Sequence, residues 1–91
     1  MATAYVTMGA VVARDVFNGE APKSVTVTTS GETAASSITA GDGDYAQVFC
    51  ATAVYARAAA TVSATTGIYC PGGIATYIKC VTGQAIALID A

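Results

Sequence analysis

The chain has 91 residues, a formal net charge of −2, and 54% hydrophobic residues against 11% charged residues. A length of this kind is one domain, and an ordinary soluble domain has about 25% charged residues. Much of the surface must therefore consist of small neutral side chains, and we expect it to pack against neighbouring proteins. With only four Lys and Arg, the chain lacks a basic patch for a phosphate backbone, so we expect no nucleic-acid partner.

Residues 1–23 are predicted to form an N-terminal arm or an edge strand. The dipeptides at 18–19 (Asn-Gly) and 21–22 (Ala-Pro) separate this region from the rest of the chain. Because the region has large apolar side chains and few charges, it supplies the first candidates for partner contacts: Tyr5, Met8, Val11, Val12 and Phe17. The alternative is that it is one more strand of the domain. No basic segment precedes an apolar run at the N-terminus, so we expect no signal peptide.

Residues 24–91 are predicted to form an antiparallel β-domain. Runs of Thr, Val, Ile and Tyr separated by Gly, Asp and Pro are typical of short strands and turns. The predicted strands in chain order are residues 24–29, 33–38, 45–50, 53–57, 68–70, 74–81 and 84–90. The fold class is therefore all-β, a small antiparallel sandwich or barrel of about six to seven strands.

The same patterns predict how some of these strands pair. Ala46, Val48 and Cys50 lie on one face of their strand, and we expect residues 53–57 to be the pairing partner of that strand. Thr82-Gly83 is a two-residue hairpin signal that would join the last two strands. Both of these carry apolar residues on both faces, which favours central positions.

Two segments allow another interpretation. The alanines of residues 53–64 would also suit a helix, but the β-branched residues among them favour a strand followed by a loop. The uncharged residues 58–78 are long enough to span a bilayer. Their hydroxyl side chains and the Pro-Gly-Gly turn at 71–73 argue against a membrane helix, so we expect no membrane partner.

No combination of residues points to catalysis. The chain has an odd number of cysteines, Cys50, Cys70 and Cys80, with no CxxC spacing, and it has no histidine. We therefore expect no disulfide framework, no zinc site and no activated thiol. Buried free thiols in a protein made in a reducing cytoplasm are the simpler interpretation. Asp42 and Asp44 lack the further oxygens that calcium requires and favour a hairpin turn. We expect no catalytic residue, no metal, no cofactor and no enzymatic activity.

Five tyrosines and no tryptophan remain as candidates for binding. Tyrosine combines contact area with a hydroxyl group, and it can bind a sugar or a protein. Packing between neighbouring strands is the simpler interpretation. Tyr55, Arg57 and Tyr69 complete the set of candidate partner contacts.

The order of strands and turns in residues 36–91 has a counterpart in a known class of proteins. The segments that carry it are Ile-Thr-Ala-Gly at 38–41, Tyr-Ala-Gln-Val at 45–48, Val-Tyr-Ala-Arg at 54–57, Gly-Ile-Tyr-Cys-Pro-Gly-Gly at 67–73, Tyr-Ile-Lys at 77–79 and Gly-Gln-Ala-Ile-Ala-Leu-Ile at 83–89. In this pattern the chain resembles small virion proteins of tailed bacteriophages, in particular capsid decoration or cement proteins. It departs from them at Cys70 and Gly72, where Leu and Ala are commoner, and at Thr82, where Pro is common.

The resemblance implies a β-sandwich protein that binds the major capsid protein lattice and stabilises the head. It further implies a homo-oligomer, with a trimer as the expectation, on the capsid exterior of the virion after synthesis in the host cytoplasm. Two other roles stay open at this point: a head–tail adaptor or tail component, and a host-surface or glycan-binding module that uses exposed tyrosines.

Overall fold

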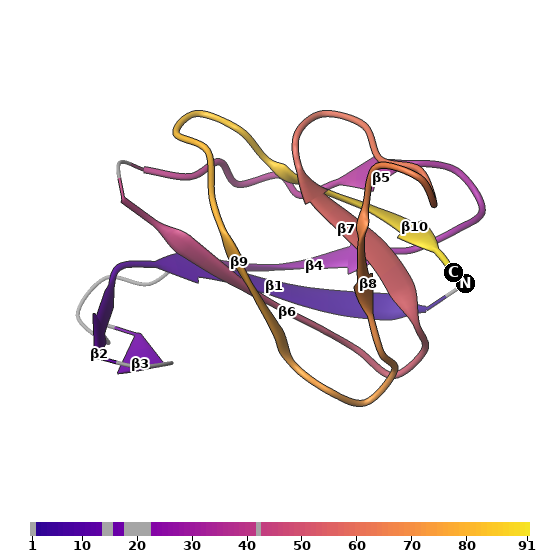
Figure 1. Cartoon of the computed structure of the whole chain (residues 1–91), viewed down its shortest axis with the longest axis horizontal. Helices are drawn as coiled ribbons and strands as arrows, with labels where there is room; N and C mark the ends of the chain where they lie inside the picture. Colours follow the sequence, from indigo (N-terminus) through magenta and orange to yellow (C-terminus); the bar gives the residue numbers. More distant parts are fainter. Residues whose placement is uncertain (1, 14–15, 18–22, 42) are drawn as a thin grey trace.

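The protein is a sandwich of two four-stranded antiparallel sheets (Figure 1). The computed structural model describes residues 2–13, 16–17, 23–41 and 43–91, with the backbone alone for 11–13 and 16–17, and these residues contain no helix. No helix among them is therefore long and apolar enough to cross a membrane. The predicted all-β antiparallel class is confirmed, and of the two architectures expected it is the sandwich.

Each sheet combines strands that are distant in the sequence. The first sheet has the order β4 (Lys23–Thr28), β1 (Thr3–Gly9), β6 (Tyr45–Cys50) and β9 (Thr76–Lys79). The second sheet has the order β5 (Ala34–Ala35), β10 (Ile86–Asp90), β7 (Val54–Ala58) and β8 (Ile68–Cys70). A separate pair is formed by β2 (Val11–Ala13) and β3 (Val16–Phe17).

Residues 3–9 follow the alternative given for the N-terminal segment, one more strand of the domain. Residues 3–9 form neither an arm nor an edge strand, because β1 lies between β4 and β6 and pairs with both over its length. Its alternate side chains Ala4, Val6 and Met8 are fully buried. Strand alternation therefore places one side of β1 in the core. Met8 is a core residue rather than a surface contact.

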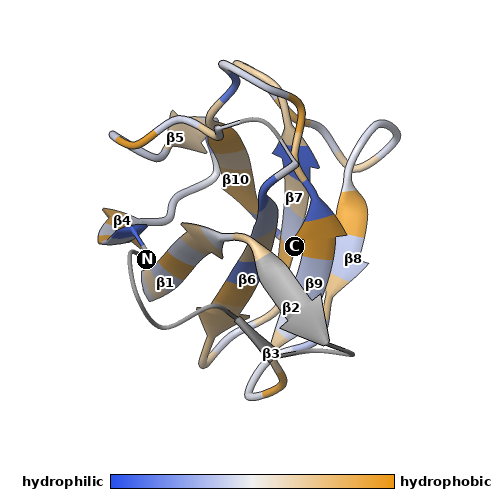
Figure 2. Cartoon of the chain, turned by 90° about the vertical axis from the view of Figure 1, so that its left-hand side faces the viewer, coloured by the Kyte–Doolittle hydropathy of each residue, from blue (hydrophilic) through white to orange (hydrophobic). Residues whose placement is uncertain are grey.

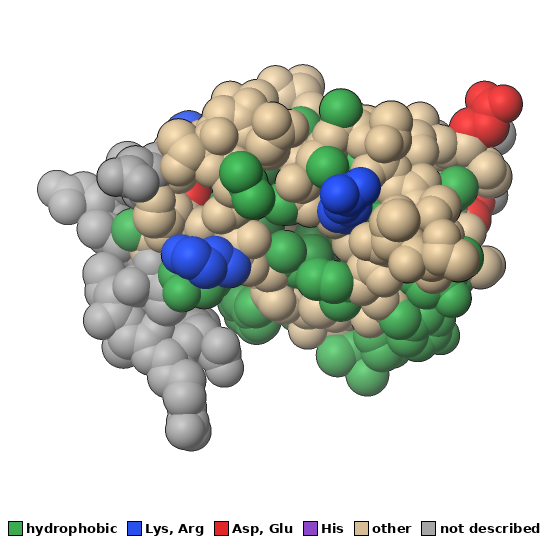
Figure 3. Space-filling view, turned by 45° about the horizontal axis from the view of Figure 1, so that its top comes forward, with side chains coloured by type: hydrophobic (Ala, Val, Ile, Leu, Met, Phe, Trp, Pro, Cys, Tyr) green, Lys and Arg blue, Asp and Glu red, His purple; other side chains and the backbone are tan. Residues whose placement is uncertain are grey.

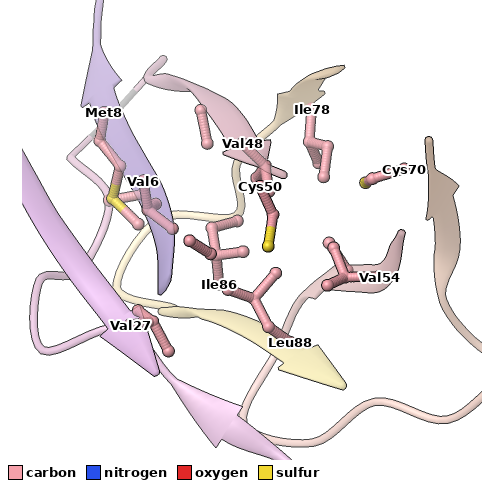
Figure 4. Close-up of a cluster of buried hydrophobic side chains, with 14 residues drawn as sticks. Val6, Met8, Val27, Val48, Cys50, Val54, Cys70, Ile78, Ile86 and Leu88 are labelled. Carbon is pink, nitrogen blue, oxygen red and sulfur yellow. The ribbon is translucent and has the colours of Figure 1, made fainter. Parts of the chain in front are cut away.

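The core lies between the two sheets (Figure 4). Period-2 alternation in the strands turns one row of apolar side chains from each sheet into this layer. The largest apolar side chains that are fully buried are Met8, Ile86, Leu88, Val6, Val48 and Val54. The accessible surface of 4851 Å² is close to the roughly 4,900 Å² that a compact chain of this mass exposes. The sandwich therefore closes its own core.

The buried hydroxyl groups of Thr29 and Ser36 form hydrogen bonds next to the ends of strands. Thr29 Oγ1 accepts a hydrogen bond from Ala2 N at 3.1 Å and donates to Ala2 O at 3.2 Å. Ser36 Oγ donates to Ile38 O at 2.8 Å and accepts from Ile86 N at 3.1 Å. Burial of an unsatisfied polar atom would be costly, and no buried side-chain polar atom among the described residues lacks a hydrogen-bond partner.

Some strand pairings differ from the prediction although the strands themselves form. β7 pairs with β10 and β8 in the second sheet, so it is not the partner of β6. The turn after Val81 does form, with Gln84 N donating to Val81 O at 3.0 Å and Gly83 at φ +81°, but it leads from the first sheet into the second and makes no hairpin. β10 is central as expected, whereas β9 is an edge strand.

Candidate interaction surface

The charged side chains of the described residues are few and scattered on the surface. Figure 3 shows one face on which basic and acidic groups are isolated from one another, while hydrophobic side chains gather along its lower margin. No group of three or more His, Cys, Asp or Glu that could hold a metal ion occurs in the part of the chain that the structure describes. The features that could recognise a partner are therefore the exposed large hydrophobic side chains. These are the aromatic Tyr5, Phe49, Tyr69 and Tyr77 and the aliphatic Ile68, Ile74 and Val81.

The outer face of the first sheet presents a row of aromatic and polar side chains. We define the aromatic face as Tyr5 from β1, Tyr45, Gln47 and Phe49 from β6, and Tyr77 and Lys79 from β9. Strand alternation turns these side chains away from the core, because their neighbours Val6, Val48 and Ile78 are buried. Tyr5, Phe49 and Tyr77 are 52%, 37% and 39% exposed.

The side chains of the aromatic face are held in place by contacts between adjacent strands. The rings of Tyr5 and Phe49, opposite one another in register, have centroids 6.5 Å apart. Gln47 Nε2 donates to Tyr77 Oη at 3.0 Å. Lys79 Nζ lies 4.8 Å from the ring centroid of Tyr45, directly across the strand pair, at a distance typical of a cation–π contact. Such contacts lower the entropy lost when a partner binds.

The outer face of the second sheet brings together three predicted contact residues. Tyr55 and Tyr69 are opposite in register and pack edge to face, with ring centroids 5.6 Å apart. Arg57 lies two residues beyond Tyr55 on the same side of β7, with its side chain exposed. Tyr69 is 54% exposed, so this pair also reaches solvent.

A loop of the chain covers part of this second face. Residues 59–66 connect β7 to β8, yet Thr33 Oγ1, beside β5, donates to Val62 O at 3.1 Å and accepts from Val62 N at 3.4 Å. To reach from β7 to the β5 side, the loop must cross β10. Consistent with this, Val62 and the outward-facing Ala87 of β10 are buried although neither belongs to the main core cluster. The loop thus covers part of the outer face of the second sheet, whereas the outer face of the first sheet keeps its aromatic side chains exposed.

Comparison with protein-family models, with curated proteins and with solved structures finds no match.

The predicted contact residues therefore divide between two opposite faces. Tyr5 belongs to the aromatic face, whereas Tyr55, Arg57 and Tyr69 lie on the second sheet. The side chains of Val11, Val12 and Phe17 lie outside the described residues. A flat partner cannot touch both sheets at once, so the candidates are two alternative surfaces.

The sequence candidates for binding included the tyrosines of the aromatic face but not Gln47, Phe49 and Lys79. The alternation of residues 45–50 indicates that Tyr45, Gln47 and Phe49 share a side, but it does not reveal whether that side is exposed. Only the register of β1, β6 and β9 places Tyr5 beside Phe49 and Tyr77 beside Gln47. The interpretation of tyrosines as packing between neighbouring strands is confirmed for these residues, and their exposure leaves a binding role open.

The acidic turn has a local structural role at Asp44. Its Oδ2 accepts a hydrogen bond from Gly41 N at 2.8 Å, and its own N donates to Gly41 O at 3.2 Å. These two bonds close the predicted turn before β6, but the turn makes no hairpin, because β5 and β6 lie in different sheets. Asp42 lies outside the described residues.

The cysteines are free thiols, as predicted, and two of them are buried. Cys50 and Cys70 lie in the core (Figure 4), whereas Cys80 is partly exposed. Burial raises the pKa of the Cys70 thiol, although a hydrogen bond with Thr76 acts in the opposite direction. Burial and the nearby Asp44 carboxylate raise the pKa of Cys80, against a smaller effect of Lys79. A raised thiol pKa disfavours the reactive thiolate, so these groups suit packing rather than nucleophilic chemistry.

Thiol labelling tests this assignment. With a charged disulfide reagent at mildly alkaline pH, we expect the Cys80 thiol to react slowly in the folded protein, and Cys50 and Cys70 to react only after denaturant is added. Reaction of all three thiols at one rate without denaturant would contradict a closed core.

The raised pKa of Cys70 also affects stability. Because the folded-state pKa of Cys70 is raised, its contribution to the free energy of unfolding is present at lower pH and is lost as the pH rises through the range in which thiols titrate.

Proposed function

We propose that the chain is a structural virion protein that binds the major capsid protein lattice on the capsid exterior through the aromatic face and stabilises the head. The observation that carries the proposal is the contrast between the two sheets. A loop of the chain covers part of the second sheet's outer face, over β10, whereas the first sheet exposes Tyr5, Phe49 and Tyr77. The resemblance of residues 36–91 to capsid decoration proteins supplies the class of partner.

The size of the molecule and the chemistry of the aromatic face suit a protein partner. A stable interface covers about 800 Å² on each side, and the molecule measures 34 by 25 Å across the view of Figure 1. Aromatic residues are enriched in interface centres and charged residues are depleted there; Lys79, the one charge of this face, lies at its margin in contact with Tyr45. Many weak copies on a repeating lattice would together stabilise a shell.

Cosedimentation with purified capsid shells tests the proposal. Wild-type protein is expected to saturate the shells at many copies, and Tyr5→Ala is expected to weaken binding by about tenfold, because a half-exposed ring is lost from the interface. Tyr69→Ala is the matched control, since Tyr69 has nearly the same exposed fraction on the opposite sheet. Loss of binding with Tyr69→Ala alone would move the interface to the second sheet, and absence of shell binding would end the capsid proposal.

Experiments with the same purified protein distinguish the proposed function from two other roles. A head–tail adaptor or tail component would bind at a small fixed copy number set by a ring instead of saturating the lattice. A glycan-binding module is favoured by one specific observation, the exposed edge-to-face pair of Tyr55 and Tyr69, since sugars stack on exposed aromatic rings. Saturable glycan binding that is lost with Tyr69→Ala and kept with Tyr5→Ala would support that role.

A further inference from the structure

The longest open edge of the sandwich is β4. It has six residues, whereas the other edge strands β9, β8 and β5 have four, three and two. β4 contains no proline and its register with β1 has no bulge. Its one charge, Lys23, is at the first position, where Nζ donates to Thr39 O at 3.1 Å. Proteins usually block such an edge with charges, prolines or bulges, and β4 lacks these devices from residue 24 onward.

The hydrogen-bond pattern shows which backbone groups face this edge. Thr29 N donates to Ala2 O at 2.7 Å, so the pair next to it, Thr28 and Thr3, turns its backbone groups away from the ladder. By the same alternation, Ser24, Thr26 and Thr28 direct their N–H and C=O groups away from β1. No described strand lies on that side (Figure 2, where β4 is at the left margin).

The sequence of this edge is complementary to itself. Residues 24–28 read Ser-Val-Thr-Val-Thr, which is close to a palindrome about Thr26. If two copies pair antiparallel with Thr26 opposite Thr26, hydroxyl side chains face hydroxyl side chains and Val25 faces Val27 of the second copy. Matched β-branched and hydroxyl pairs stabilise neighbouring strands.

We infer that β4 is a self-association edge, at which a second copy of this chain adds its own β4 antiparallel about a two-fold axis through Thr26. The backbone groups of Ser24, Thr26 and Thr28 pair with those of Thr28, Thr26 and Ser24 of the second copy. The result is one continuous eight-stranded sheet with both aromatic faces on the same side. The symmetry gives a dimer in place of the trimer that the resemblance implies, and the inference does not depend on the proposed function.

Mass measurement by light scattering, with variants of β4, tests this inference. The wild-type protein is expected at twice the 9.0 kDa chain mass, and Thr26→Pro is expected to be monomeric with an unchanged circular dichroism spectrum. Proline at Thr26 removes an N–H that points to the second copy and not to β1. Val25→Pro is the control, because it removes an N–H directed at β1 and is expected to destabilise the fold. Thr26→Lys, which places like charges at the axis and leaves the backbone intact, is expected to weaken dimerisation at least tenfold.

Disulfide trapping tests the register. Thr26→Cys is expected to give a covalent dimer on oxidation, because opposite residues of an antiparallel pair lie within disulfide distance. Ser24→Cys is the matched control: its position faces Thr28 of the second copy, so it is expected to give no dimer alone and to give one when combined with Thr28→Cys. A monomeric wild-type protein at its highest soluble concentration, or a dimer that persists in Thr26→Pro and Thr26→Lys, would overturn the inference.

Discussion

A chain that lacks residues 2–9 is expected not to fold. β1 is hydrogen-bonded to β4 on one side and to β6 on the other, and it supplies the fully buried side chains of Ala4, Val6 and Met8. Its removal would open the first sheet at its centre and expose the inner faces of both sheets. Circular dichroism and thermal unfolding would measure this, and a cooperative transition in the truncated chain would contradict the central position of β1.

A single substitution gives the same test in milder form. Met8→Ala is expected to lower the free energy of unfolding by about 2–5 kcal/mol, a large part of the roughly 5–14 kcal/mol expected for a chain of this length. Thr7→Ala is the control on the same strand, because its hydroxyl contacts Ser24 Oγ on the solvent side at 3.2 Å. That change is expected to cost less than about 1 kcal/mol.

Gly72→Ala is expected to destabilise the protein by about 1–3 kcal/mol through overpacking. A Cβ atom at this position would lie 2.7 Å from Ala51 O and 3.1 Å from Ala53 N. Both are backbone atoms of the turn between β6 and β7, so they cannot move aside as a flexible side chain could. The turn at 71–73 is fastened there by the hydrogen bond from Gly73 N to Cys50 O at 2.8 Å.

Gly31→Ala is the matched control for this prediction. No heavy atom lies within 4 Å of a Cβ built at Gly31, and its φ is outside the left-handed region. Alanine there is expected to be neutral, or to stabilise by up to about 1 kcal/mol through the entropy of the unfolded chain. Urea unfolding of the two variants side by side measures the difference; equal midpoints would show that the 71–73 turn is not packed as described.

The chain organises its two outer faces in different ways, and this difference underlies the functional proposal. Thr33 and Val62 fix a loop across the second sheet, while the first sheet keeps its aromatic row at the surface. If β4 also pairs as inferred, two such rows would lie side by side on one sheet. A bivalent surface of this kind binds a repeating lattice more tightly than either row alone.

The amino-acid sequence by itself determined the class of fold and the position of most strands. Residues 45–50 and 68–70 form strands with the predicted bounds, and Ala46, Val48 and Cys50 are buried together. These features depend on local alternation and on turn residues, which act over a few positions. The turn closed by Asp44 and the free thiols follow from equally local chemistry.

The tertiary structure decided which sheet each strand joins and which surfaces remain exposed. Alternation in residues 3–9 is the same for an edge strand and for a central one, so only the pairing with both β4 and β6 assigns Met8 to the core. The turn at Thr82-Gly83 forms in either case, but its strands separate into different layers because β10 pairs with β7 and β5. Pairing between distant strands depends on the burial of the whole chain, and no short segment carries that information.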